Sequence, residues 1–118
     1  MKLLGVLLLL LPLSALAGDR VVGVGISLSQ KDHRLFVQSV VPGAPADLDG
    51  SIHAGDEILS VKPFAGDDQP GWITVDQLSL PEFVQLVRGE AGAPVGLHLT
   101  NTRGQFEVSL DREPFDVP

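Results

Sequence analysis

Two glycines near the start of the chain, in Gly23-Val24-Gly25-Ile26, give the sequence its clearest chemical feature. Glycines in a short loop allow successive backbone N–H groups to point toward one place, and this arrangement binds an anion such as a carboxylate. A strand is expected to leave the loop at Ile26, and its open edge can pair with an incoming peptide. Taken alone, the same glycines also fit an ordinary tight turn.

Residues for catalysis do not gather in a comparable way. His33, His53 and His98 fall in a turn, a loop and a strand without the spacing of metal ligands. Beyond the N-terminal segment, Lys31 and Lys62 are the only lysines that a serine nucleophile could use, and neither lies in a recognisable nucleophile motif. We therefore expect no enzyme activity, no catalytic residue, no metal and no cofactor.

The first 17 residues have the pattern of a secretory signal peptide. Lys2 precedes an apolar run, and the small residues around Ala17 are typical of a cleavage site before Gly18. The apolar run is shorter than the roughly 20 residues that span a bilayer. We expect a periplasmic or secreted protein, with contact to a membrane only if the signal stays uncleaved as an anchor. The chain has no cysteine, which excludes a disulfide or a lipid attached to one.

The formal net charge of the 118-residue chain is −7. Such a surface repels nucleic acid and anionic lipid, so we expect neither as a partner. The charge is otherwise what simple solubility requires, and it names no ligand. The length beyond the signal suits one domain, which we place at residues 18–110, followed by a flexible acidic tail at 111–118.

The elements that must position the glycine loop are mostly strands. Apolar and β-branched residues predict strands at 21–22, 26–28, 34–41, 57–61, 95–100 and 105–110, the last two joined as a hairpin. Pro45 starts one helical turn at 44–48. Ser79 and Glu82 form a capping box, and the apolar spacing behind it predicts one long helix that ends near Gly89. The fold class is α+β: a small barrel or sandwich of about five to six strands, capped by one long helix and one short helical turn.

This order of elements resembles a PDZ domain. The most specific motifs are Pro45-Ala46 and Gly55-Asp56-Glu57-Ile58-Leu59-Ser60-Val61, in addition to the glycine loop. The segment Phe83-Val84-Gln85-Leu86-Val87-Arg88-Gly89 is similar to the PDZ domain of bacterial carboxy-terminal processing (tail-specific) proteases, without their catalytic domain. Residues 62–79 form a longer connection than in most relatives, which leaves open whether this insertion blocks or extends the groove.

The resemblance implies a role for each residue of the groove. Gly23, Val24, Gly25 and Ile26 would bind the carboxylate of a peptide, through the N–H groups of the last three. Ser27 and Leu28 would lie along the peptide, and Leu80, Val84 and Val87 would line the pocket for its final side chain, while Phe83 and Leu86 face the core. Arg20 is the expected charge partner, although an ordinary terminal charge explains it equally well.

The function implied is an exported, non-catalytic module that captures C-terminal tails of other proteins by strand addition. The partners expected are envelope or secreted proteins, including a protease or its substrate. The alternative is a structural, self-associating protein whose groove is occluded by its own insertion or tail.

Overall fold

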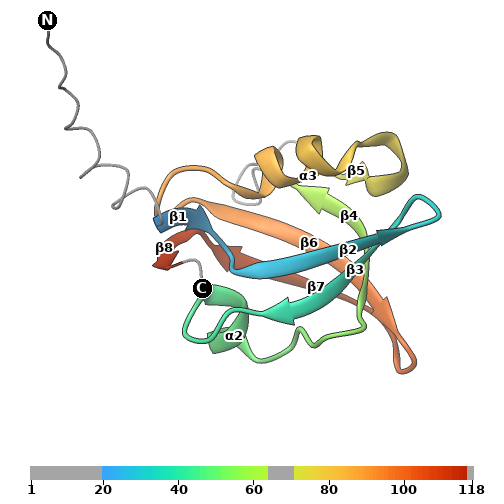
Figure 1. Ribbon diagram of the computed structural model, residues 1–118, viewed down its shortest axis with the longest axis horizontal. Coiled ribbons are helices and arrows are strands. Elements are labelled where there is room, and N and C mark those ends of the chain that lie inside the picture. Colours follow the sequence, from blue (N-terminus) through green and yellow to red (C-terminus); the bar gives the residue numbers. More distant parts are fainter. Residues whose placement is uncertain (1–19, 64–70, 117–118) are drawn as a thin grey trace, which may run out of the picture.

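The computed structural model describes residues 20–63 and 71–116, which form a curved set of strands with one substantial helix beside it (Figure 1). The strands are β1 (Arg20–Gly23), β2 (Ile26–Lys31), β3 (Arg34–Val40), β4 (Glu57–Lys62), β5 (Ile73–Thr74), β6 (Pro94–Asn101), β7 (Gly104–Asp111) and β8 (Glu113–Asp116). The helices are α2 (Pro45–Asp49), the 3-10 turn η1 (Val75–Gln77) and α3 (Leu80–Val87). The predicted α+β class, with one long helix and one short one, is confirmed.

The main sheet places β2 at one edge. Its strand order is β2-β3-β4-β6-β7, with the short β5 paired to β4, and all of these pairs are antiparallel. The hairpin predicted across Asn101-Thr102-Arg103-Gly104 joins β6 to β7. Because β2 has a partner on one side only, its other side is an open edge within the described structure.

The core lies between the sheet and α3 and is built from aliphatic side chains. Ile58, Val61, Val95, Leu97 and Leu99 are fully buried on the central strands β4 and β6. Phe83 of α3 is also buried and packs against this cluster. The two inner strands therefore form a fixed surface, against which α3 is held at one side of the sheet.

Helix α3 begins where the capping box predicts. The Ser79 Oγ accepts a hydrogen bond from the Glu82 N–H at 3.2 Å, and the Glu82 carboxylate accepts one from the Ser79 N–H at 2.8 Å. The hydrogen bond from the Ser79 backbone N–H, together with the Ser79 hydroxyl, lowers the pKa of the Glu82 carboxyl. Because the box satisfies N–H groups that have no partner inside the helix, it fixes the residue at which α3 starts and hence which face meets the sheet.

The number of strands and the predicted tail need correction. The described residues contain eight strands rather than five to six, because β5 and β8 are additional. β8 lies in the segment predicted to be a flexible tail, and it pairs with β1 so that Pro114 faces Val22. A proline is tolerated in such an outer strand because its missing N–H need not enter a ladder, so the proline and the acidic residues did not prevent pairing.

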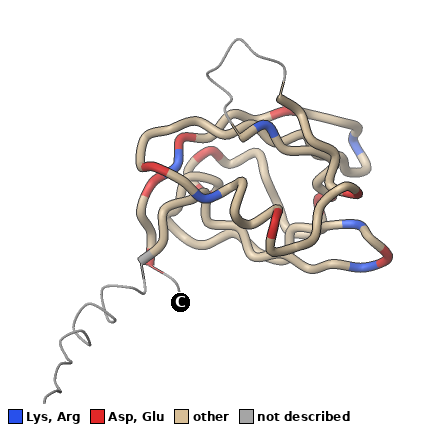
Figure 2. The backbone as a smooth tube through the Cα atoms, turned by 90° about the horizontal axis from the view of Figure 1, so that it is seen from above, with Lys and Arg blue, Asp and Glu red and all other residues tan. Residues whose placement is uncertain are grey.

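The charged residues do not form one large patch. Figure 2 shows the Asp and Glu positions spread over several sides of the fold, with Lys and Arg between them. Among residues 20–63 and 71–116, no three His, Cys, Asp or Glu side chains are grouped closely enough to hold a metal ion. No helix in this described part of the chain is long and apolar enough to cross a membrane.

Candidate functional site

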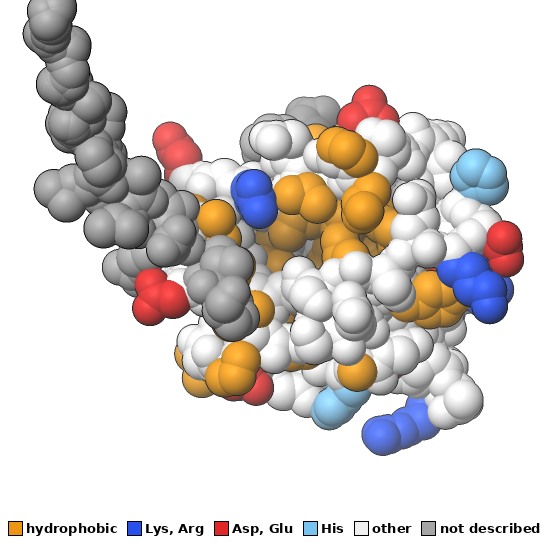
Figure 3. Space-filling model, in the orientation of Figure 1, with side chains coloured by type: hydrophobic (Ala, Val, Ile, Leu, Met, Phe, Trp, Pro, Cys, Tyr) orange, Lys and Arg blue, Asp and Glu red, His pale blue; other side chains and the backbone are white. Residues whose placement is uncertain are grey.

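A hollow of about 260 Å³ lies between β2 and α3. Figure 3 shows apolar side chains gathered in a depression on this face, with a basic side chain at one end. Twelve residues line the hollow: Gly23, Val24, Gly25, Ile26, Leu28, Leu80, Phe83, Val84, Val87, Arg88, Leu97 and Phe115. The structure thus brings the predicted glycine loop, the start of β2 and the predicted helix face to one place.

The glycine loop is anchored through its carbonyl groups. The Val24 carbonyl accepts a hydrogen bond from the Ala46 N–H at 3.0 Å, and the Gly25 carbonyl accepts one from the Val41 N–H at 2.8 Å. Within the described residues, the N–H groups of Val24 and Gly25 have no acceptor. The loop is therefore held from behind while two of its donors remain available beside the hollow.

Gly25 has to be glycine for two reasons. Its φ is +77°, in the left-handed region that side chains disfavour, and a Cβ at this position would overlap the Cβ of Ala44. Ala44 is buried where the chain enters α2. The close approach of Ala44 therefore leaves no room for a side chain at this residue.

The first residues of β2 direct their polar backbone groups to the open edge. Polar groups along a strand point alternately to its two sides. Since the Gly25 carbonyl bonds Val41 toward β3, Ile26 has its N–H and C=O on the open side. Val37, which lies opposite Leu28, donates its N–H to the Asp56 carbonyl and accepts a hydrogen bond from the Gly55 N–H. Neither group is left for Leu28, so the backbone N–H and C=O of Leu28 also point to the open side. Pairing with an added strand needs donors and acceptors of this kind.

Ser27 is placed differently from the other groove residues. The register of β2 against β3 shifts between Ser27 and Leu28, and Ser27 Oγ lies 2.8 Å from Ser39 Oγ of β3. Its side chain does not line the hollow. Ser27 therefore belongs to the β2–β3 contact, because alternation along the strand turns it away from Ile26 and Leu28.

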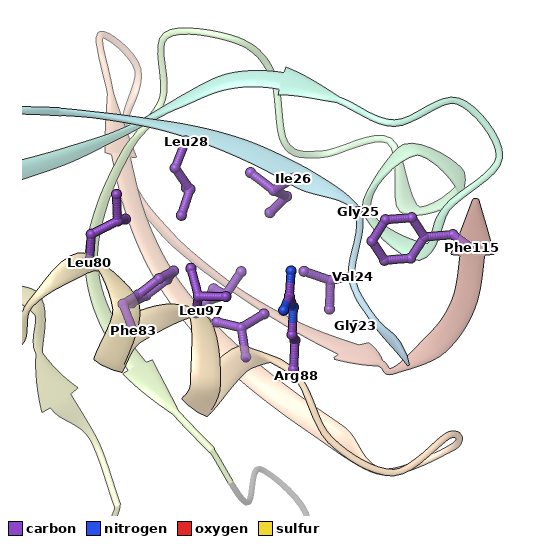
Figure 4. Close-up of a pocket in the computed structure, with 12 residues that line it drawn as sticks. Gly23, Val24, Gly25, Ile26, Leu28, Leu80, Phe83, Arg88, Leu97 and Phe115 are labelled. Carbon is purple, nitrogen blue, oxygen red and sulfur yellow. The ribbon is translucent and has the colours of Figure 1, made fainter. Parts of the chain in front are cut away.

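The predicted helix face does line the hollow. Leu80, Val84 and Val87 all border it, as their spacing along α3 requires. Phe83 is 2% exposed and belongs to the core, as expected, yet its ring also forms part of the wall (Figure 4). Leu97 of β6 also lines the hollow, a role that the sequence does not indicate because β6 reads as core.

Arg88 is a candidate for the site that the sequence pattern did not indicate. It follows the last residue of α3, and its side chain extends toward Val24 at the loop end of the hollow (Figure 4). Its Cγ would lie 3.7 Å from a Cβ placed on Gly23, so its aliphatic stem packs over the loop. In the sequence, Arg88 stands just before Gly89, near which the helix is expected to end, and a basic residue is common there.

Arg20 was the predicted charge partner, and the structure gives only its backbone, which lies in β1. The Arg20 side chain is not described, so its role stays a prediction, and Arg88 is the cation among the described residues that line the hollow. Phe115 of β8 is a second unexpected neighbour, with its ring beside Gly23. The segment predicted as a tail thus supplies one wall of the site.

Trp72 lies apart from the groove. It is 41% exposed, and its ring meets that of His98 edge to face with centroids 6.2 Å apart. In the predicted insertion at 62–79, residues 64–70 fall outside the described structure. Within the residues that are described, 62–63 and 71–79 contribute no lining to the hollow.

The fold and the groove define the class of protein, and comparison with known families agrees. A family model described as PDZ domain matches residues 14–99. The chain belongs to the PDZ domain family. A PDZ domain alone is a binding module, and the likeness to proteases lies in their PDZ region.

Two of the similar proteins are bacterial C-terminal processing proteases. The chain is 33% identical over 84 residues to the tail-specific protease of Haemophilus influenzae, covering 70% of this chain and 11% of that protein. It is 28% identical over 96 residues to the carboxy-terminal processing protease CtpA of Bacillus subtilis, covering 80% and 18%. The chain therefore spans less than a fifth of either protease.

A solved structure with a similar fold is the PDZ domain of the carboxy-terminal protease from Vibrio cholerae, determined in complex with a peptide. The TM-score is 0.72 at 26% sequence identity, and the alignment covers 83% of this chain and 99% of that one. The PDZ regions of bacterial C-terminal processing proteases thus resemble this chain in both sequence and fold.

Proposed function

We propose that this protein is an exported, non-catalytic PDZ module that captures the C-terminal tails of partner proteins by strand addition. The observation that carries the proposal is the hollow itself. It combines an apolar lining, the open edge of β2 and two loop N–H groups without an acceptor in the described structure. A peptide terminus has the complementary parts: a side chain, a backbone and a carboxylate.

The bound tail would lie between β2 and α3, antiparallel to β2. Ile26 and Leu28 pair with its backbone, and its terminal carboxylate accepts hydrogen bonds from the N–H groups of Val24, Gly25 and Ile26. Arg88 supplies positive charge at that end. Its final side chain enters the apolar part of the hollow, where burial contributes roughly 1.5–3 kcal/mol. With the ordering cost of the tail subtracted, the affinity should be near micromolar, about −8 kcal/mol.

The partners proposed are tails of envelope or secreted proteins, including a protease or its substrate. Export rests on the signal-like residues 1–17 and is supported by likeness to bacterial C-terminal processing proteases. The alternative of a self-occluded groove gains little support from the described C-terminal residues. Phe115 borders the hollow at one end and leaves it open.

A comparison of free-acid and amidated peptides tests this function. Hexapeptides with randomised C-terminal positions are screened as free acids, and the tightest binder is measured by calorimetry in both forms. Amidation removes the charge and keeps the side chains, so we expect about a tenfold loss of affinity, the equivalent of 1.4 kcal/mol. Equal affinity of the two forms would show that the terminal carboxylate does not contribute to binding. Failure of every free-acid peptide to bind would favour the occluded alternative.

A further inference from the structure

Arg112, between β7 and β8, is buried in an unusual way for a charged residue. It is 4% exposed, and within the described structure its side chain makes five hydrogen bonds, all to main-chain carbonyl groups. Burial lowers the pKa of its guanidinium. A buried cation without a carboxylate is costly, and the planar guanidinium with its five N–H donors is the side chain best able to satisfy such a ring of acceptors.

Two of these carbonyl groups belong to the last turn of α3. The Arg112 Nε donates to the Val87 carbonyl at 2.8 Å, and Nη2 donates to the Leu86 carbonyl at 2.9 Å. Carbonyl groups at this end of a helix have no partner inside the helix, and a positive charge is favourable there. Arg112 therefore fixes the position at which α3 ends.

The same side chain connects α3 to two other segments. Nη2 also donates to the Pro63 carbonyl at 2.8 Å, and Nη1 donates to the carbonyls of Ala93 and Pro94 at 3.3 and 3.2 Å. Pro63 follows β4, and Pro94 begins β6. The helix end is thus held against the two central strands by a single side chain.

Gly89 shows how closely Arg112 approaches the helix. A Cβ on Gly89 would lie 2.9 Å from the Arg112 Nε and 3.0 Å from its Cδ. The φ of Gly89 is not in the left-handed region, so this contact is what requires a glycine. Any side chain here would push the guanidinium away from the carbonyl groups of α3.

Arg88 stands directly between these two contacts. It follows Val87, whose carbonyl Arg112 holds, and precedes Gly89, which packs on the Arg112 side chain. The Arg88 N–H completes the helix by donating to the Val84 carbonyl at 3.1 Å, and the Arg88 stem lies over Gly23. A shift of the helix end would therefore move the guanidinium of Arg88 away from the loop.

We propose that Arg112 is a positioning residue for ligand binding, which holds the end of α3 so that Arg88 faces the carboxylate of the bound tail. This inference rests on the proposed function. It assigns a binding role to a segment that lies beyond residues 14–99, the part matched by the PDZ family. Arg112 itself, buried behind the helix, does not line the hollow.

The test uses Arg112→Lys and Gly89→Ala, each measured with the free-acid and amidated peptide and checked for folding by urea unfolding. Lysine keeps the charge but has three donors in place of the planar set. Both variants should lose affinity for the free acid, about three- to fivefold, close to the loss expected from removing Arg88 itself. Affinity for the amidated peptide should change less than twofold.

A double-mutant cycle with Arg88→Gln separates positioning from general destabilisation. In the Arg88→Gln background, Arg112→Lys should cause no further loss of free-acid affinity. The inference would be overturned if Arg112→Lys caused the same loss of free-acid affinity in both backgrounds. It would also be overturned if a folded Arg112→Lys or Gly89→Ala protein kept the full preference for the free acid over the amidated peptide. Arg103→Lys, in the β6–β7 turn, is the matched control. Lack of discrimination by the unaltered protein would instead count against the proposed function.

Discussion

Replacing Gly25 with alanine is expected to destabilise the protein by about 2–5 kcal/mol. A side chain at φ +77° costs about 1–2 kcal/mol, and the overlap of the new Cβ with Ala44 adds about 1–3 kcal/mol. Since domains of this kind unfold with only about 5–15 kcal/mol, the loss is a large part of the total. Urea unfolding followed by circular dichroism measures it, and peptide affinity should fall as the loop moves.

Gly43→Ala is the matched control for this substitution. Gly43 has nearly the same backbone angle, φ +80°, but no atom lies within 4 Å of a Cβ placed there. It should therefore show the backbone cost alone, about 1–2 kcal/mol. Adding Ala44→Gly to the Gly25→Ala protein should restore part of the stability. Equal losses in the two single variants would mean that α2 does not press on the loop as described.

Reversing the charge of Arg88 is expected to weaken binding of a free-acid peptide about 30-fold. Arg88→Gln removes the attraction to the carboxylate, about 1 kcal/mol or fivefold for an exposed pair, and Arg88→Glu adds repulsion of similar size. Affinity for the amidated peptide should change far less. Calorimetry on the three proteins at low and moderate salt measures both effects, and the difference should shrink as salt rises.

Arg103→Glu serves as the control for net charge. Arg103 is exposed in the β6–β7 turn and does not line the hollow, so its reversal changes the total charge by the same amount. Free-acid affinity should change less than twofold. If Arg103→Glu weakens binding as much as Arg88→Glu, the effect comes from the overall charge of the protein and not from a cation at the loop.

The parts of the fold that the sequence predicted are those with strong local signals. The Ser79–Glu82 capping box set the start of α3 correctly, and apolar spacing placed Leu80, Val84 and Val87 on the hollow. The glycine loop was predicted from Gly23 and Gly25, and Gly25 has a φ of +77°, which favours glycine. Each of these features is defined by residues close together in the sequence, so it can be recognised before the fold is known.

The parts that were missed depend on contacts between distant segments. β8 contains Pro114 and acidic residues, so only its pairing with β1 makes it a strand. Arg88 and Arg112 look like ordinary charges until the helix end is placed beside Gly23 and β6. Ser27 was assigned to the groove because of its position on β2, but alternation along the strand places its side chain on the other face from Ile26 and Leu28, next to Ser39.

The most direct test of the binding mode follows backbone amide signals of the ¹⁵N-labelled protein by NMR during titration with the free-acid peptide and its amidated copy. We expect the Val24, Gly25 and Ile26 amide protons to move downfield with the free acid, and far less with the amidated copy. Ile26 and Leu28 should also gain protection from hydrogen exchange. Shifts that are the same for both peptides, or that cluster away from β2 and α3, would contradict capture of a terminal carboxylate at this loop.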